Sequence, residues 1–124
     1  MDIKIQQWIE KQNLENQLKI EKIREWTLSL SPYFSEKFRY QTLFFDHKSI
    51  LLYLSVNPKS ELYAGFVQGH LMDNSEGHLE GDHNKQIRHF YFREMTKETE
   101  ENYRCLVLEA IDLEKEMLKL KKRK

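Results

Sequence analysis

Residues 70–83 form the polar segment of the chain that is most suggestive of chemistry. They contain three histidines and four carboxylates, His70, His78, His83, Asp73, Glu76, Glu80 and Asp82. Imidazole and carboxylate groups suit Zn, Fe and Mn. However, the spacing between the histidines matches no compact helical or zinc-ribbon site. We therefore expect an exposed polar loop, assign no metal ligand and no cofactor, and keep metal binding as an alternative.

A second candidate combines aromatic rings with charges in residues 33–45, which read YFSEKFRYQTLFF. We expect a ligand-binding cleft between the sheet and the N-terminal helices, with an arginine of a later strand as an anion contact. The predicted ligand-binding residues are Glu36, Arg39, Tyr40, Phe45 and Arg88. The alternative, in which the rings belong to the core and the charges to its rim, stays open.

Catalysis has no support from motifs. The chain lacks a Gly-x-Ser-x-Gly elbow, a Walker loop, a dinucleotide-binding glycine motif and a His-Glu-x-x-His pair. Its single cysteine, Cys105, has no activating partner nearby in sequence, so we expect a buried structural thiol. No catalytic residue is predicted, although an enzyme whose groups converge only in space stays an alternative.

The charge balance restricts the partners. Twenty basic residues face 20 acidic ones, so the formal net charge is zero, which argues against a dedicated nucleic-acid binder. A basic tail, residues 119–124, follows a helix that begins with acids, an order that the helix dipole explains. No apolar run is long enough to span a membrane. A single cysteine favours the cytoplasm.

Helical periodicity marks both ends of the chain. Asp2 and Asn13 are predicted to cap two N-terminal helices, the second of which ends near Ser31-Pro32. Thr96 is predicted to cap a long C-terminal helix. The apolar stripe of this helix comprises Tyr103, Leu106, Val107, Ala110, Leu113, Met117 and Leu120. A second apolar side of the second helix, Leu14, Leu18 and Leu28, predicts that two neighbours cover this helix.

Alternating apolar and polar residues predict four strands, over 36–45, 49–56, 61–68 and 87–93. The strand 49–56 is apolar on both sides, so we expect it to be central and covered on both faces. The predicted fold is a single α+β domain, residues 1–124. In it, N-terminal helices and a long C-terminal helix pack on a small antiparallel sheet. The strand 87–93 could form an edge, which leaves a homodimer open.

The order of Ser31-Pro32 and Glu36-Lys37-Phe38-Arg39-Tyr40 resembles the YdhG-like family of small proteins of unknown function. Glu36, Tyr40 and Phe45 fit the family pattern, whereas Gln41 and Leu43 stand where the family has Gly and Pro. The turn or bulge formed by that Gly and Pro is therefore in question here. Tyr63-Ala64-Gly65-Phe66 and Lys85-Gln86-Ile87-Arg88 are also similar to stretches of this family.

The resemblance implies an α+β sandwich of helices on an antiparallel sheet. Some relatives are described as frataxin-like iron chaperones, which implies iron or other divalent-metal handling as an alternative function. Our leading hypothesis is a non-enzymatic cytoplasmic protein that binds a small ligand or a protein partner through the aromatic and charged cleft.

Overall fold

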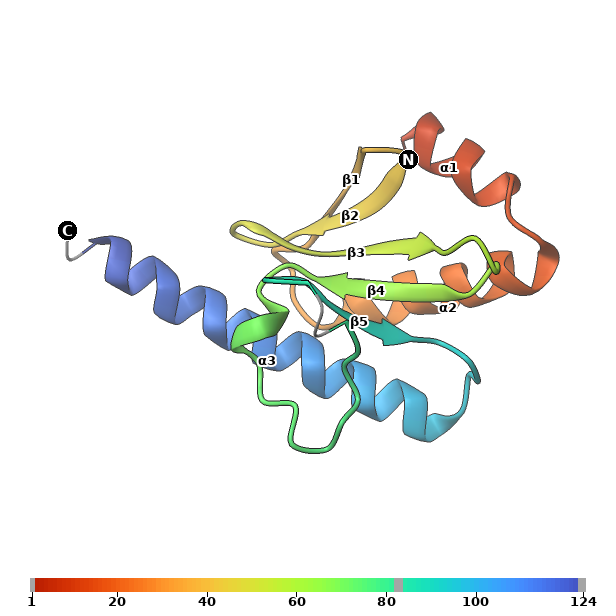
Figure 1. Cartoon of the computed structure of the whole chain (residues 1–124). Coiled ribbons are helices and arrows are strands. Elements are labelled where there is room, and N and C mark those ends of the chain that lie inside the picture. The colour runs from red at the N-terminus through yellow and green to blue at the C-terminus, as the bar shows by residue number, and fades with distance from the viewer. Residues whose placement is uncertain (1, 82–83, 123–124) are drawn as a thin grey trace.

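The computed structural model describes residues 2–81 and 84–122 and confirms the α+β fold (Figure 1). Over this part of the chain the helices are α1 (Ile3–Glu10), α2 (Leu14–Ser29) and α3 (Lys97–Lys122), with a short 3-10 helix, η1 (Gly69–Leu71). The strands are β1 (Ser35–Arg39), β2 (Thr42–Asp46), β3 (Ile50–Val56), β4 (Leu62–Phe66) and β5 (Arg88–Tyr91).

The predicted caps begin the helices. The Asp2 side chain accepts a hydrogen bond from the Lys4 backbone N–H at 2.8 Å, and the Asn13 side chain accepts one from Asn16 at 2.8 Å. Thr96 Oγ1 accepts one from the Thr99 N–H at 3.1 Å. Each side-chain oxygen satisfies a backbone N–H that has no partner within its helix. These starts are confirmed.

The sheet is an antiparallel meander in the order β1-β2-β3-β4-β5. The expectation of a single strand over 36–45 is wrong, because the chain turns back at Tyr40 and Gln41. Both residues have positive φ, 51° and 61°, which is the geometry of a type I′ hairpin turn. Such turns are usually marked by Asn-Gly, so Tyr-Gln gave no sequence signal.

One face of the sheet packs against α2 and α3, which Figure 1 shows behind the strands. The core lies in this layer, where Ile20 and Ile23 of α2 and Tyr103 of α3 are fully buried against alternate strand residues. The strand residues of this core include Leu43, Phe45, Leu52, Leu54, Leu62, Ala64, Phe66 and Phe90. The opposite face, which we call the open face, points away from these helices.

Two expectations about coverage are wrong. Among the residues that the structure describes, none covers the second apolar side of α2, since Leu14, Leu18 and Leu28 are 70%, 66% and 40% exposed. β3 is central, as predicted, but on the open face its Tyr53 is only half-buried.

The stripe of α3 is buried from Tyr103 to Ala110, and Glu114 is the last buried residue of the helix. Beyond it the helix extends past the sheet (Figure 1), and Leu120 is 59% exposed. Over the described residues, no helix combines the length and the apolar character needed to cross a membrane.

Candidate functional site

The structure separates the five predicted ligand-binding residues. Glu36 points toward α2, where its carboxylate accepts hydrogen bonds from Arg24 Nε at 2.6 Å and Nη2 at 2.8 Å. Phe45 has no exposed surface. Arg88, on the far edge of the sheet, donates to the backbone oxygens of Asn84 and Ile87 at 2.6 and 3.0 Å. These three side chains already have structural partners.

Arg39 and Tyr40 lie elsewhere. Arg39 reaches along the open face to Asp46, with two hydrogen bonds of 2.7 and 2.6 Å. Tyr40, in the hairpin turn, is 89% exposed. A hollow of about 440 Å³ between α1 and this turn is lined by Tyr40, together with Lys4, Gln7, Trp8, Lys11, Phe38 and Gln41. Of the five predicted residues, only Tyr40 lines it.

The polar residues of the histidine-rich loop are mostly exposed, as expected, but its Met72 and Leu79 are buried in the core. The described part of the loop contains η1 and a bridge between Glu80 and His89. His78 pairs with Glu76 at 3.0 Å, and His70 contacts the Gln86 backbone oxygen at 3.2 Å. Within residues 2–81 and 84–122, no group of three or more His, Cys, Asp or Glu side chains is arranged to hold a metal ion. Asp82 and His83 lie outside the described residues.

Cys105 is exposed, so the expectation of a buried thiol is wrong. The buried stripe of α3 runs through Tyr103, Leu106 and Val107, and position 105 falls on its solvent side. The thiol lines a hollow of about 240 Å³ between α3 and the loop, beside His78 and Glu109.

The open face carries a row of aromatic rings that no single segment of the sequence predicts. We call it the aromatic row. It consists of Phe44 from β2, Tyr53 from β3, Tyr63 from β4, and His89 and Tyr91 from β5. Neighbouring ring centroids are 5.2 Å apart from Phe44 to Tyr53, 6.3 Å from Tyr53 to Tyr63 and 5.4 Å from Tyr63 to Tyr91. His89 lies 4.2 Å from Tyr63. The rings form a continuous line across four strands.

The pairing register assembles this row. Phe44 lies opposite Tyr53, Tyr53 opposite Gly65, and Tyr63 opposite Tyr91. Gly65 makes room for the Tyr53 ring, because a Cβ atom there would lie 2.3 Å from the Tyr53 ring. Burial, together with the neighbouring Tyr63, raises the pKa of Tyr53 to about 12.

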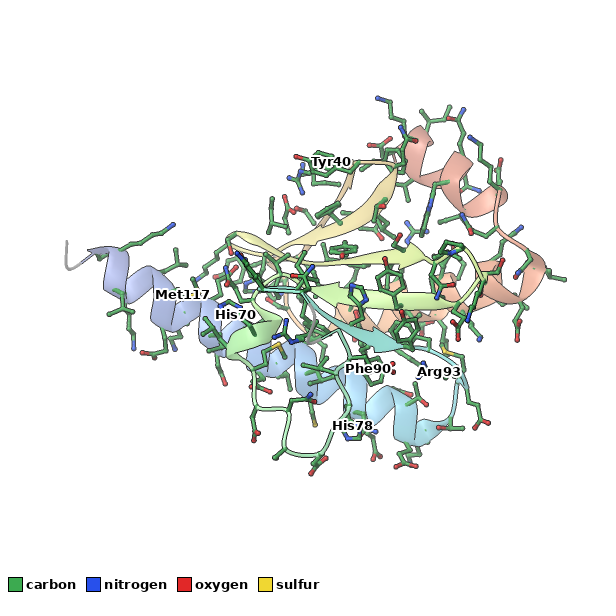
Figure 2. All side chains as sticks on the ribbon, in the orientation of Figure 1. Tyr40, His70, His78, Phe90, Arg93 and Met117 are labelled. Atoms are coloured by element: carbon green, nitrogen blue, oxygen red, sulfur yellow. The ribbon has the colours of Figure 1, made fainter. Side chains whose placement is uncertain are left out.

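An arginine covers each end of the row. The Arg39 guanidinium lies 5.4 Å from the centre of the Phe44 ring, and that of Arg93 lies 4.6 Å from the centre of the Tyr91 ring. Tyr40 and Arg93 mark these two sides of the sheet in Figure 2. Both arginines are paired with carboxylates, and these pairs raise their pKa values.

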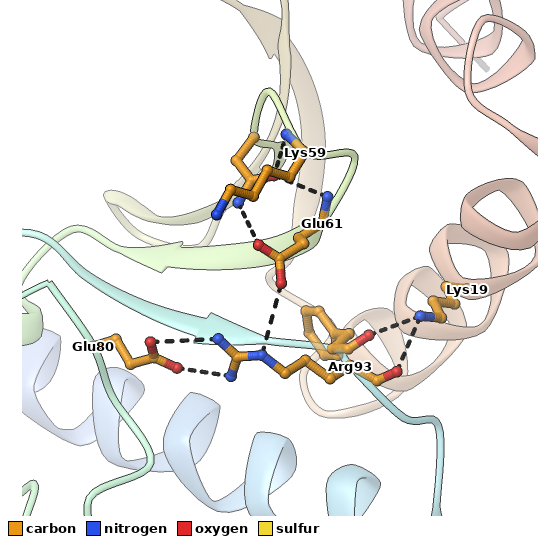
Figure 3. A network of polar contacts seen from close by, with 7 residues as sticks. Lys19, Lys59, Glu61, Glu80 and Arg93 are labelled. Atoms are coloured by element: carbon orange, nitrogen blue, oxygen red, sulfur yellow. Dashed lines mark hydrogen bonds and ion pairs between the residues drawn. The ribbon is translucent and has the colours of Figure 1, made fainter.

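Figure 3 shows the Arg93 end in detail. Arg93 Nη1 donates to Glu80 at 2.8 Å, and its Nε lies 3.8 Å from Glu61. Behind it, Lys19 of α2 donates to the backbone oxygens of Phe92 and Arg93 at 2.9 and 3.4 Å. This network fixes the backbone that follows β5 against α2, and therefore positions the guanidinium over Tyr91.

A second polar arrangement has the connectivity of a Ser-His-acid triad. Ser31 Oγ lies 2.7 Å from His47 Nε2, and His47 Nδ1 lies 2.7 Å from Glu114 Oε1. A catalytic serine also needs donors for a developing oxyanion. Ser31 follows the carbonyl end of α2, whose dipole opposes negative charge. We therefore interpret the arrangement as a structural link between α3 and the turn after β2.

Comparisons with protein-family models, with curated proteins and with solved structures found no match to this chain. The resemblance to the YdhG-like family therefore stays a prediction.

Proposed function

We propose that the protein binds a small ligand on the aromatic row of its open face. The observation that supports this proposal is a line of rings across four strands that α2 and α3 leave uncovered, in which Phe44 is buried and the tyrosines and His89 are half-buried. Aromatic side chains in a sheet are normally buried by a second layer, because their burial contributes strongly to folding. Here neighbouring rings pack in tilted and T-shaped pairs, and the tyrosines and His89 keep part of their surface exposed.

The size of the face favours a ligand over a large protein partner. From β2 to β5 it spans three strand spacings, about 14 Å, and a five-residue strand is about 17 Å long. That gives an area on the order of 250 Å², whereas a stable protein–protein interface buries roughly 800 Å² on each partner.

This proposal moves the predicted site across the sheet. Arg39 and Tyr40 stay near it, because Arg39 covers Phe44 and the Tyr40 ring lies 6.1 Å from that of Phe44. Glu36, Phe45 and Arg88 are not part of it. We also propose a cytoplasmic location, where an exposed, unpaired thiol such as Cys105 is kept reduced.

The test is a screen of small molecules against the ¹⁵N-labelled protein, with binding located by amide chemical-shift changes. We expect hits to shift the amides of Tyr53, Tyr63 and Tyr91. Tyr63→Ala should weaken the binding of each hit about tenfold, the loss typical of one stacking contact. Tyr33→Ala is the matched control, because Tyr33 is exposed and packs near His47 instead of on the row.

Hits that cluster in the hollow beside α1, and that bind the Tyr63→Ala variant with unchanged affinity, would contradict the proposal. Circular dichroism of each variant establishes that it is folded. If Tyr63→Ala does not fold, Tyr91→Ala on the edge strand β5 tests the same contact.

A further inference from the structure

We infer that the ligand of the aromatic row is an uncharged oligosaccharide, bound across the strands. This inference rests on the function proposed above. It follows from three properties of the open face: a stacking surface along the row, arginines at its two ends that are already paired with carboxylates, and hydrogen-bond donors and acceptors in these pairs.

The rings supply the stacking surface. An aromatic face carries negative charge density and attracts the weakly positive C–H groups of a flat apolar surface. The half-buried rings of Tyr53, Tyr63 and Tyr91 come from successive strands, so they repeat across the sheet. A chain of sugar rings presents such C–H faces at regular intervals, and a ligand lying across the strands would meet one aromatic ring after another.

The arginines at both ends of the row are already paired with carboxylates. Asp46 holds Arg39 with two hydrogen bonds, and Glu80 holds Arg93 with bonds of 2.8 and 3.4 Å. Glu61 adds a further carboxylate beside Arg93. A phosphate placed at either guanidinium would meet these carboxylates, so the local electrostatics disfavour a polyanion. The zero net charge of the whole chain agrees with this.

The same pairs can bind hydroxyl groups. A guanidinium has five N–H donors and a carboxylate has about four acceptor positions, so a paired arginine and carboxylate keep unused donors and acceptors side by side. Neighbouring sugar hydroxyls each offer one donor and two acceptor lone pairs, which matches such a pair. The hydroxyl of Tyr53, whose pKa is raised to about 12, stays neutral in between.

The inference is tested by isothermal titration calorimetry and NMR with four probes: maltotriose, cellotriose, triacetylchitotriose and hexathymidylate. We expect at least one trisaccharide to bind. Its dissociation constants at low and at high salt should differ by less than twofold, because an uncharged ligand releases no counterions. Its binding should shift the amides of the aromatic row.

Two matched pairs of variants locate the site. Tyr63→Ala should weaken trisaccharide binding about tenfold, whereas Tyr33→Ala should leave it within twofold. Arg93→Lys removes the bidentate fork at the row, and we expect a loss of about fivefold. Arg104→Lys makes the same change on the surface of α3, where Arg104 pairs with Glu100 at 2.8 Å, and should have no effect.

The outcomes separate the two proposals. Salt-sensitive binding of hexathymidylate at the row, without any trisaccharide, overturns the inference and leaves the proposed site intact. Trisaccharide binding that the Tyr63→Ala and Arg93→Lys variants retain also overturns it. If none of these probes binds at the row and the small-molecule screen yields no hit there, both proposals are wrong.

Discussion

At the scale of single residues, Glu114 shows how a buried charge is stabilised. Its carboxylate accepts hydrogen bonds from His47 Nδ1 at 2.7 Å and from the Lys48 N–H at 3.2 Å. The Ser49 N–H and hydroxyl donate to it at 2.8 and 2.6 Å. Burial alone would raise the pKa of Glu114, but the hydrogen bonds from Ser49 and His47 outweigh it and lower the pKa. The ionised carboxylate is therefore the form that holds α3 to the turn.

The lowered pKa predicts a pH dependence of stability. As the pH falls, the unfolded chain takes up this proton before the folded protein does, so the stabilisation is complete at neutral pH. It disappears as the pH falls below about 4.5, toward the folded pKa. Glu114→Gln should lower the free energy of unfolding at pH 7 by about 2–3 kcal/mol. The NH₂ group of the glutamine cannot accept the hydrogen bonds that Lys48 and Ser49 donate to the carboxylate. At pH 3 the loss should be smaller.

Urea denaturation at both pH values measures these losses. Glu116→Gln is the control, since Glu116 is exposed on the same helix, where it pairs with Lys119 at 3.5 Å. We expect it to change the free energy of unfolding by less than about 0.5 kcal/mol. An equal loss for Glu114→Gln at pH 3 and pH 7 would show that the ionised carboxylate does not provide the stabilisation.

At the scale of elements, the hairpin between β1 and β2 carries a local conformational cost. Tyr40 and Gln41 adopt φ values of 51° and 61°, in a region that L-residues other than Asn and Asp rarely occupy. The turn must nevertheless form, because it sets the register that places Lys37 opposite Phe44 and Arg39 opposite Thr42. The energy of strand pairing maintains this conformation.

We therefore expect Gln41→Gly to raise the free energy of unfolding by about 0.5–1 kcal/mol, since glycine relieves the strain at positive φ. Gln68→Gly is the matched control. Gln68 has a φ of −105°, so the same substitution there only adds freedom to the unfolded chain and should be destabilising. Thermal unfolding of both variants measures the difference. A decrease in melting temperature for Gln41→Gly would contradict the strain that we assign to the turn.

The helix starts and the later strands could be predicted because their signals are local. Asn13 and Thr96 cap with their own side chains, and alternation marks β3 and β4. The hairpin was missed because Tyr-Gln resembles the strand residues around it. The prediction that two neighbours cover α2 was wrong, because periodicity identifies an apolar face without showing that anything covers it.

The candidate site could not be read from one segment, because a strand sends successive side chains to opposite faces. Glu36 and Arg39 are close in sequence, yet the first meets α2 and the second lies over Phe44. The aromatic row has the reverse property, because its rings are distant in sequence and the pairing register brings them together. A signal was nevertheless available, because Tyr53, Tyr63 and Tyr91 stand at the strand positions that alternate with the core residues, and they therefore share the opposite face of the sheet.

At the scale of the whole molecule, Tyr103 joins α3 to the sheet and to α2. Its ring is fully buried and lies 5.2 Å from Phe92, 6.1 Å from Phe90 and 6.3 Å from Trp26, measured between centroids. Burial raises the pKa of its hydroxyl, which keeps the proton in place. That hydroxyl lies 2.6 Å from Thr27 Oγ1.

The direction of this hydrogen bond follows from the partners of Thr27. Thr27 Oγ1 donates its only proton to the Ile23 backbone oxygen at 2.7 Å, so Tyr103 must be the donor to Thr27. Removing the two hydroxyls should therefore have unequal effects. Tyr103→Phe leaves Thr27 with a partner, whereas Thr27→Val leaves a buried Tyr103 O–H without one.

We expect Tyr103→Phe to lower the free energy of unfolding by about 1 kcal/mol and Thr27→Val by about 2–3 kcal/mol. The double variant should be more stable than Thr27→Val alone, because a fully apolar contact replaces an unsatisfied donor. Chemical denaturation of all four proteins completes the cycle. Additive losses would mean that the two hydroxyls act independently, and that ring packing alone connects α3 to α2 at this position.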